Sequence, residues 1–313
     1  MSSYKIVRYD PKHKVQWDAF IATAKNTSFL FFREFIGYHN EKFDDYSILV
    51  FKDKKVIAAL PAHRVDKKLY SHNGLTYGAF VLPEGISFKK VKSIFDMILA
   101  YLTENGFEEF ILKLIPSFYM TEPAFEIQHL MINEGAVVTG SELNFAVDYF
   151  FRETISKNKL RHFRKNELLD FSIEKGDFRP FWRDILIPRL AEKFGSQPVH
   201  SLEEIELLHS HFPDNIQQYN LFKDEELLAG ITVFISGMTA KSQYAATTAQ
   251  GEKMRAMDQL YIFLIQKYKA LGFKFFDLGT VKGGSEPYNF GLIKQKEELG
   301  GKAYLQKTIK LKL

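Results

Sequence analysis

Two stretches of the chain show the same order of apolar and polar segments. In the first, the apolar runs Tyr46–Phe51 and Val56–Pro61 flank the polar segment Lys52–Lys55. Two β-prone runs joined by a short polar turn predict a β-hairpin. The second stretch repeats this pattern, in the segments Tyr219–Phe222, Lys223–Glu226 and Leu227–Ile235.

Each predicted hairpin is followed by a further strand, a helix and a closing strand. The helices have apolar residues at helical spacing, and a glycine follows each, at Gly106 and Gly272, the usual residue just past a helix end. In the first stretch, the segments are a strand near Leu69–Phe80, a helix over Val91–Glu104 with Ser87 as its N-cap, and a strand over Phe107–Leu114. In the second, they are Ala240–Thr248, Ala256–Ala270 and Phe273–Leu278.

The two stretches also match residue by residue. Phe51–Leu60 resembles Phe222–Ile231, and Ser71–Ala79 meets Ser242–Gln250, both at an offset of 171 positions. The closing strands match at an offset of 166. A fixed period indicates an internal duplication, so we predict two superposable units. Hairpin, strand, helix and strand make a mixed sheet with a crossover helix, which is an α/β (α+β) fold class.

The predicted domains are a first unit over 1–140 and a second over 141–301, followed by a C-terminal strand in 302–313. The first unit opens with helices near Val15–Ala24 and Arg33–Asn40. The second contains a longer helical insert, Asp177–Phe194 with Leu202–His211. The C-terminal segment alternates apolar and polar residues over Ala303–Leu313, which is typical of a strand.

The amino-acid composition excludes several classes of protein and of functional site. The 313 residues are 46% hydrophobic and 26% charged, which excludes a disordered chain. The absence of cysteine excludes disulfides, thiolate zinc sites and a cysteine nucleophile. His209 and His211 are the only close histidine pair, and their i,i+2 spacing points them apart on a helix, so we expect no metal site.

The charge and hydropathy of the chain suggest where it works. A formal net charge of +4 is compatible with an anionic ligand but is too small to indicate a nucleic-acid-binding protein. The N-terminal segment has no apolar core of a signal peptide, and no apolar run approaches the roughly 20 residues that a membrane span needs. We therefore expect a cytoplasmic protein without a membrane span.

Three motifs carry a resemblance to a known family: the basic run Lys159–Lys165, the strand end Phe276–Gly279, and Gly291–Gly301, which reads GLIKQKEELGG. The duplicated unit resembles the GNAT acyltransferase fold in tandem, and the motifs are similar to those of the Fem family of bacterial peptidoglycan-bridge aminoacyltransferases and related acetyltransferase-like proteins. The chain departs from the family pattern at Gln295 and Leu299, where the family has Phe. The family's glycine-rich phosphate loop is incomplete in both copies.

The resemblance implies an N-acyltransferase. Such an enzyme would move an aminoacyl or acetyl group from aminoacyl-tRNA or acyl-CoA onto the amine of a small molecule or peptide, with a cell-wall precursor peptide as one acceptor. It would need no metal. The resemblance also implies that the C-terminal strand returns to complete the first unit. The alternative is a catalytically degenerate module that binds an anionic ligand such as RNA or a nucleotide-linked precursor.

Acyl transfer to an amine needs a held acceptor, a group that takes the amine's proton, and positive charge or N–H donors near the developing oxyanion. The resemblance implies that Lys296 stabilises the tetrahedral intermediate or the leaving group. Tyr288, Glu286 and Asp277 lie just upstream, where a strand ends and a loop begins, and any of them could relay the proton. The alternatives are a solvated lysine on a charged helix face and, upstream, ordinary turn chemistry.

The remaining candidates are binding residues. Arg161, Arg164 and Lys165 fall on one side of a predicted helix, where the family places its anionic substrate; a solvated basic face is the alternative. The resemblance puts the acceptor site of the first unit at Arg33, Tyr38, His72, Asn73 and Tyr77, with a hairpin turn and a half-buried tyrosine as the alternative. An anionic cofactor could bind the helix start at Gln250, Gly251, Lys253 and Arg255.

Overall fold

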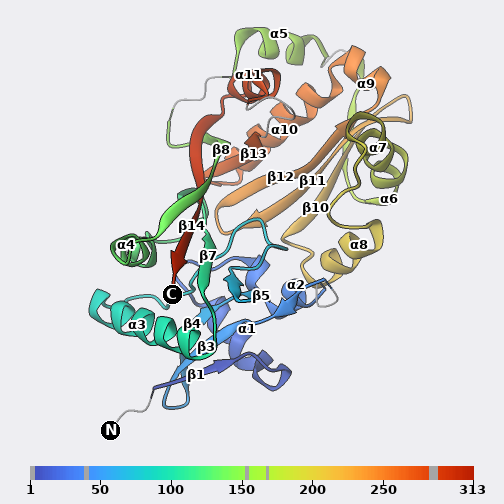
Figure 1. The fold of residues 1–313 in the computed structure, drawn as a ribbon. Helices are drawn as coiled ribbons and strands as arrows, with labels where there is room; N and C mark the ends of the chain where they lie inside the picture. The colour runs from blue at the N-terminus through green and yellow to red at the C-terminus, as the bar shows by residue number, and fades with distance from the viewer. Residues whose placement is uncertain (1–3, 39–41, 152–154, 167–168, 282–287) are drawn as a thin grey trace. The chain divides into compact units, whose positions relative to one another are not determined.

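The computed structural model describes residues 4–38, 42–151, 155–166, 169–281 and 288–313 (Figure 1). The chain forms two compact units. Unit 1 comprises Met1–Glu142 together with Leu305–Leu313, and unit 2 comprises Leu143–Tyr304.

Unit 1 contains two β-sheets. A three-stranded antiparallel sheet has the order β1-β3-β4, with bounds Tyr4–Arg8, Ile48–Lys52 and Lys55–Leu60. The other sheet has the order β2-β5-β6-β7-β14, with bounds Asp44–Asp45, His63–Val65, Lys68–Tyr70, Glu109–Lys113 and Lys302–Lys312. Its helices are α1 (Lys14–Ala22), α2 (Arg33–Gly37), α3 (Phe88–Glu104) and α4 (Glu126–Asn133), with 3-10 turns at Pro11–His13, Phe29–Phe31 and Ser117–Tyr119.

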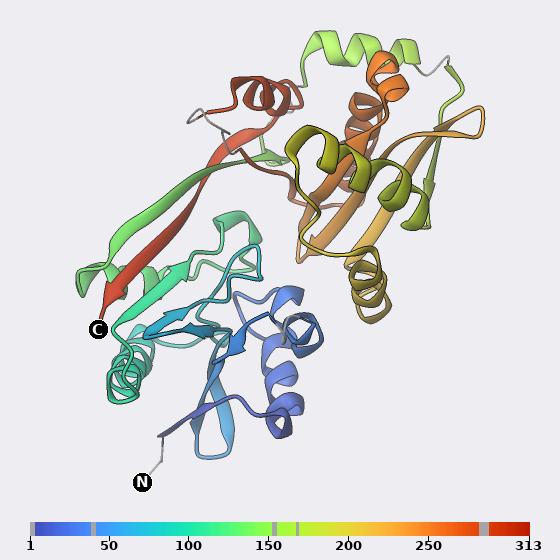
Figure 2. The same ribbon diagram turned by 45° about the vertical axis from the view of Figure 1, so that its right-hand side comes forward.

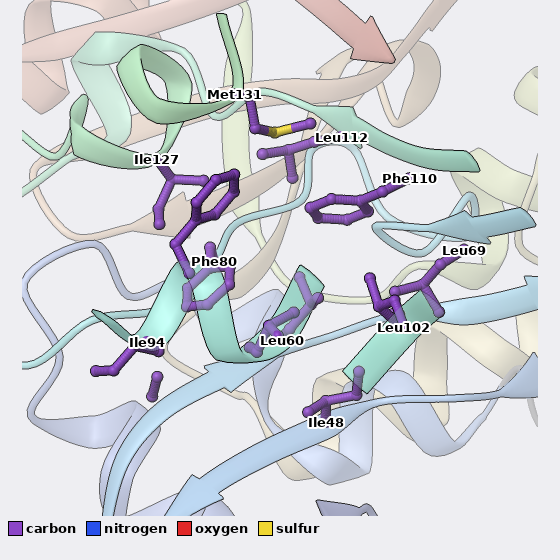
Figure 3. Close-up of a cluster of buried hydrophobic side chains, with 14 of the residues drawn as sticks. Ile48, Leu60, Leu69, Phe80, Ile94, Leu102, Phe110, Leu112, Ile127 and Met131 are labelled. Carbon is purple, nitrogen blue, oxygen red and sulfur yellow. The ribbon is translucent and has the colours of Figure 1, made fainter. Parts of the chain in front are cut away.

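The core of unit 1 forms where α3 and α4 pack on the sheets. The apolar side of α3 is buried, as its period predicts: Val91, Ile94, Phe95, Ile98 and Leu102. Figure 3 shows this cluster, to which the strands contribute Leu69, Phe110 and Leu112. The helix starts after Ser87, as predicted, although the Ser87 side chain makes no capping hydrogen bond.

Unit 2 is built on one mixed sheet with the order β8-β13-β12-β11-β10-β9. The strands are β8 (Val137–Asp148), β9 (Ser172–Lys175), β10 (Ile216–Lys223), β11 (Glu226–Ser236), β12 (Thr239–Thr247) and β13 (Phe275–Val281). The helices are α5 (Lys157–Asn166), α6 (Arg179–Phe181), a π-helical turn (Trp182–Leu186), α7 (Ile187–Phe194), α8 (Leu202–His211), α9 (Ala249–Met254), α10 (Ala256–Ala270) and α11 (Phe290–Glu298). Figure 2 shows α10 on one face of this sheet and α6 to α8 on the other.

The hairpins of the two units have the same strand register. Ile48 pairs with Leu60 in unit 1, and Tyr219 pairs with Ile231 in unit 2, 171 positions later in each strand. Both hairpins have a β-bulge at the same place, after Val50 and after Leu221. The repeat in the sequence is thus a repeat of hydrogen-bonded pairs.

The parallel strand pairs also correspond. Lys68 pairs with Glu109 in β6 and β7, as Thr239 pairs with Phe275 in β12 and β13. In each unit the second strand of the parallel pair has a further, antiparallel neighbour, and the two neighbours come from different parts of the chain. β14, from the C-terminus, pairs antiparallel with β7, whereas β8, from the start of unit 2, pairs antiparallel with β13. The strand predicted over Ala303–Leu313 is β14.

The strand predicted near Leu69–Phe80 is wrong beyond Tyr70, where β6 ends. His72 has a left-handed φ of 51°, which takes the chain out of the extended conformation. The segment folds back instead. Ser71 Oγ accepts a hydrogen bond from Lys113 N at 2.9 Å, and a Cβ on Gly78 would lie 2.3 Å from that same Oγ. The helix predicted over Arg33–Asn40 ends at Gly37.

Candidate active site

The strands β12 and β13 of unit 2 pair only at their beginnings. The parallel ladder runs from Thr239 with Phe275 to Lys241 with Asp277, and β12 then continues to Thr247 without further pairs to β13. Just past this point, Gln243 is the extra residue of a bulge between β12 and β11. A bulge bends its strand and often lies beside a functional site. The sheet of unit 2 therefore opens between these two strands.

A cavity of about 280 Å³ lies along the unpaired half of β12. Helices α7, α9, α10 and α11 supply its other walls. Its lining residues are Arg189, Leu190, Lys193, Ala245, Ala246, Thr247, Glu252, Met257 and Gln295. Concave sites of this kind, with a few polar groups among apolar ones, are where small ligands bind. Most of these residues belong to segments that the sequence did not mark as functional.

Lys296 follows Gln295, a residue that lines this cavity, on α11. Its side chain is buried, and its Nζ donates hydrogen bonds to three successive carbonyl oxygens, those of Leu278, Gly279 (2.8 Å) and Thr280 (3.2 Å). These carbonyls lie beyond the last residue of β13 that pairs with β12. The interpretation of Lys296 as a solvated lysine on a helix face is therefore wrong.

The glycines of the C-terminal motif hold this arrangement. Gly300 has a φ of +88°, and its N–H bonds to the carbonyl of Glu297, which ends α11. A Cβ on Gly301 would lie 2.8 Å from the carbonyl oxygen of Lys296 and 3.0 Å from Leu278. The motif therefore encodes the close approach of α11 to β13 as well as the lysine itself.

Asp277 is fully buried one residue before these carbonyls. Its Oδ1 accepts a hydrogen bond from Gly279 N at 2.7 Å, which is the predicted turn chemistry. Its carboxylate also acts on Lys296. Burial lowers the pKa of Lys296 to about 8, the negative charge of Asp277 opposes that shift, and the cation of Lys241 adds to it. The structure thus brings together two of the catalytic candidates, Lys296 and Asp277.

Of the other upstream candidates, the structure describes Tyr288. It is half exposed, and its ring lies 5.9 Å from that of Phe290. Glu286 lies outside the described residues.

Sequence reasoning missed a hydroxyl pair at the same opening. Ser242 Oγ and Tyr261 OH are 2.8 Å apart, and Ser242 follows directly on the last β12 residue that pairs with β13. Burial raises the pKa of Tyr261, which keeps the phenol protonated at neutral pH. Comparison of the two copies could have found the polar cluster, because unit 1 has Phe95 and Ile111 at the positions of Tyr261 and Asp277.

A second missed cluster spans α7 and α9 at the cavity wall. Glu252 Oε1 accepts from Arg189 Nη2 at 2.5 Å and from Lys193 Nζ at 2.7 Å. The Lys193 hydrogen bond is the main cause of the lowered pKa of Glu252. These ion pairs tie the helical insert of unit 2 to the helix that follows β12, and Arg189 also pairs with Glu192 at 2.9 Å.

The predicted cofactor residues lie on or just after the short helix α9. Gly251 N donates to Thr248 Oγ1 at 2.9 Å, and a Cβ on Gly251 would lie 2.5 Å from the carbonyl oxygen of Leu228. Packing therefore explains this glycine. Gln250, Lys253 and Arg255 are exposed. Their role in cofactor binding stays a prediction.

The basic helix α5 has one buried side and one exposed side. Lys159 is buried and pairs with Asp258 at 2.5 Å, while Arg161, Arg164 and Lys165 are exposed. Burial lowers the pKa of His162, and the cations of Arg255, Arg161 and Lys165 lower it further. Arg255 therefore lies in the same positive field as two residues of α5, which joins two predicted sites into one basic surface, α5 with Arg255.

In unit 1, Arg33 is a buried structural residue. Its guanidinium lies 3.6 Å from the ring centre of Tyr9, donates to Ser47 Oγ at 3.3 Å and pairs with Asp45. Tyr38 packs against Phe35 at 5.6 Å between ring centres. The arrangement of Arg33 favours a role in holding the fold over the predicted contact with substrate.

The other unit 1 candidates are also mostly internal. His72 is buried, with its ring 5.4 Å from that of His63, and Asn73 N lies 3.3 Å from His63 Nδ1. Tyr77 is buried, and its OH lies 3.0 Å from Ser28 Oγ. Of these residues only Asn73 is exposed. Substrate binding by this group stays a prediction.

The described part of the chain lacks two features. No group of three or more histidine or carboxylate residues there could hold a metal ion. Within the same residues, no helix is long and apolar enough to cross a membrane.

Comparison with known proteins gives one matching family model and several solved structures of similar fold. Residues 151–289 match the family model of the acetyltransferase (GNAT) domain. The crystal structure of FemX is similar with a TM-score of 0.71 at 10% identity, over 99% of this chain and 97% of that chain. L-PGS from Bacillus licheniformis has a TM-score of 0.61 at 14% identity, over 96% and 91% of the two chains. A tandem GNAT protein from the clavulanic acid biosynthesis pathway has a TM-score of 0.52 at 10% identity, over 99% and 98%.

No curated protein sequence matches the chain. The family match lies within unit 2, and the structural matches span both units. The chain therefore has the fold of tandem GNAT proteins, and the segment that matches the GNAT domain model lies in its second half. The predicted fold class and the resemblance to Fem-like GNAT proteins are confirmed.

Proposed function

We propose that unit 2 is an N-acyltransferase that moves an aminoacyl or acetyl group from aminoacyl-tRNA or acyl-CoA onto an amine, with a cell-wall precursor peptide as one candidate acceptor. The observation that carries this proposal is the opening between β12 and β13, with a 280 Å³ cavity along β12 and a buried lysine bonded to the end of β13. The match of this unit to the GNAT domain supports the same reaction class.

In this proposal the opening holds the acyl group and the cavity holds the acceptor amine. Lys296 supplies a buried positive charge where the tetrahedral intermediate becomes negative, and charge acts strongly in a site that excludes water. Asp277 balances that charge from the neighbouring strand position. Tyr261, with Ser242 as its partner, is a protonated hydroxyl that can give its proton to the leaving group and regain one from the amine nitrogen that has attacked the acyl carbon.

The donor in this proposal is anionic. Both candidate donors, acyl-CoA and aminoacyl-tRNA, carry phosphates, and the basic surface of α5 with Arg255 suits them. The tandem GNAT protein of the clavulanic acid pathway is described in its state without acetyl-CoA, which supports the first donor. The family resemblance of the motifs supports the second.

The test is transfer of a radiolabelled acyl group to an amine acceptor, first with acetyl-CoA and then with aminoacyl-tRNA. Lys296→Met should lower turnover by roughly 10²–10³ while the donor still binds. Lys294→Met, at an exposed position of the same helix, is the matched control. Tyr261→Phe should lower turnover with little effect on folding, because it removes only the hydroxyl.

Donor binding without transfer to any amine would contradict this function. That result would favour the module that binds an anionic ligand. Wild-type turnover in folded Lys296→Met would contradict the role given to the lysine and leave the reaction class standing.

A further inference from the structure

One end of the unit 2 sheet exposes four large apolar side chains. Phe150 is 89% exposed, Leu271 60%, Phe151 55% and Met238 44%. Each lies where an element ends: Phe150 and Phe151 follow β8, Met238 lies between β11 and β12, and Leu271 follows α10. Single exposed apolar residues are ordinary, but several gathered at one end of a unit indicate a contact surface.

Backbone hydrogen bonds join the ends that carry Phe150, Phe151 and Met238 through Lys274, which lies three residues after Leu271 in the chain. Lys274 N donates to the carbonyl of Met238 at 2.9 Å, and Tyr149 N donates to the carbonyl of Lys274 at 3.0 Å. The rings of Phe150 and Phe151 meet edge to face at 5.4 Å. A shallow hollow of about 600 Å³ lies beside them, lined by Asp148, Tyr149, Phe150, Phe151, Phe273, Lys274 and Phe275. We call Phe150, Phe151, Met238 and Leu271, with the flanking lysines, the end patch.

Two exposed lysines, Lys269 and Lys274, flank the end patch. Asp148, the acidic residue that lines the hollow in the described part of the chain, is buried and accepts a hydrogen bond from Tyr304 OH at 2.7 Å. Its carboxylate is thus turned inward, whereas the two lysines lie at the surface.

We propose that the end patch docks unit 2 on the surface of an anionic lipid bilayer. Aromatic side chains are stable at the boundary between headgroups and acyl chains, and nearby lysines add attraction to anionic headgroups. Side chains at the tips of turns can enter that boundary without moving the sheet. This inference goes beyond the proposed acyl transfer and does not depend on it.

The experiment is vesicle co-sedimentation of the intact chain. Phosphatidylcholine vesicles are compared with vesicles that contain about 30% phosphatidylglycerol, at low salt and then at about 0.5 M NaCl. The expected result is binding to the anionic vesicles that weakens with salt. The double variant Phe150→Ser/Phe151→Ser should reduce the partition coefficient about tenfold or more, as should Lys269→Glu/Lys274→Glu.

Matched controls come from exposed positions elsewhere. Phe125→Ser and Lys89→Glu/Lys90→Glu change residues of the same types outside the end patch and should bind like the wild type. A second readout is Phe150→Trp, whose fluorescence should be quenched by brominated lipids because the new indole enters the bilayer boundary. The two natural tryptophans, Trp17 and Trp182, are fully buried.

Three results would overturn the proposal. One is equal sedimentation with neutral and anionic vesicles. Another is unchanged binding in both end-patch double variants. The last is self-association of the wild-type chain in light scattering that the Phe150→Ser/Phe151→Ser variant abolishes, since a second copy of the chain would then be the occupant.

Discussion

The Nζ atom of Lys296 lies 2.8 Å from the carbonyl oxygen of Gly279, so a side chain of α11 completes the hydrogen bonding at the end of β13. Within a sheet such carbonyls normally bond to the neighbouring strands, and β12 has already stopped pairing here. Lys296 thus has a structural task that can be measured apart from any role in turnover.

Lys296→Met should lower the free energy of unfolding by about 2–4 kcal/mol, because it leaves three carbonyl oxygens without this donor. Removing a buried charge offsets part of the loss. Urea denaturation measures the effect, with Lys294→Met expected within about 0.5 kcal/mol of the wild type. Equal stability of the two variants would mean that water replaces the ammonium at no cost.

Gly301→Ala should destabilise the protein by about 2 kcal/mol or more, because the new Cβ would lie 2.8 Å from a backbone oxygen of α11. Gly291→Ala is the control within the same motif. Its Cβ would approach only Asn289 Oδ1, at 3.5 Å, and alanine is the better helix former. Thermal unfolding of both variants should show opposite signs, and a neutral Gly301→Ala would contradict the packing described for this glycine.

Stability should fall as the pH falls from about 6.5 to about 4, because burial lowers the pKa of His63 to about 4 while Asp45 and Asp44 oppose the shift. In this window the unfolded chain binds the proton and the folded chain does not, so acid favours unfolding. The loss attributable to this group reaches about 3 kcal/mol at most. His63→Gln should flatten the dependence measured by urea denaturation at several pH values.

His129→Gln, at an exposed position of α4, is the control for that experiment and should keep the wild-type slope. A slope unchanged by His63→Gln would assign the acid sensitivity to other groups.

Arg33→Ala should destabilise unit 1 by about 3–5 kcal/mol, because it leaves Asp45 partly buried without its partner and opens the stack on Tyr9. Arg33→Lys keeps the charge and should recover part of the loss, since an ammonium cannot stack as the planar guanidinium does. Melting temperatures measure both. Weaker acceptor binding at wild-type stability would instead support the substrate contact that the family resemblance implies.

Charge reversal on the basic surface tests donor binding. Arg161→Glu/Arg164→Glu should weaken binding of an anionic donor and flatten its dependence on salt, because fewer counterions are released when the donor binds. Fluorescence titration at several salt concentrations gives both quantities. The pair Lys89→Glu/Lys90→Glu has the same charge change on exposed residues of unit 1 and should leave both unchanged.

The duplication could be predicted from the sequence because both units contain the same turn and helix-end signals. Both hairpin turns contain an aspartate with positive φ, Asp53 at 56° and Asp224 at 48°, and aspartate is one of the few residues that tolerate this conformation. Helix α3 is bounded by its apolar period and by Gly106, with a φ of +77°. Such signals depend on residues a few positions apart, so they can be recognised without the tertiary structure.

The residues of the candidate site in unit 2 could be predicted only in part from the sequence. The motif pointed to Lys296 and Asp277, which the structure places in one buried cluster. It could not show that the ammonium bonds to the carbonyls of β13, because that depends on where α11 packs. The Ser242–Tyr261 contact likewise joins a strand to a helix 19 positions away, and neither residue belongs to a motif.

The repeat, the order of its elements and the motif around Lys296 can be derived from the amino-acid sequence, because each depends on periodicity or on residues close in the chain. Which charged side chains are buried depends instead on how the elements pack. Arg33 and Lys159 look like surface cations in the sequence, but Asp45 and Asp258 pair with them inside the units. A buried charge needs a partner, and here that partner is supplied by packing between elements that are separate in the sequence.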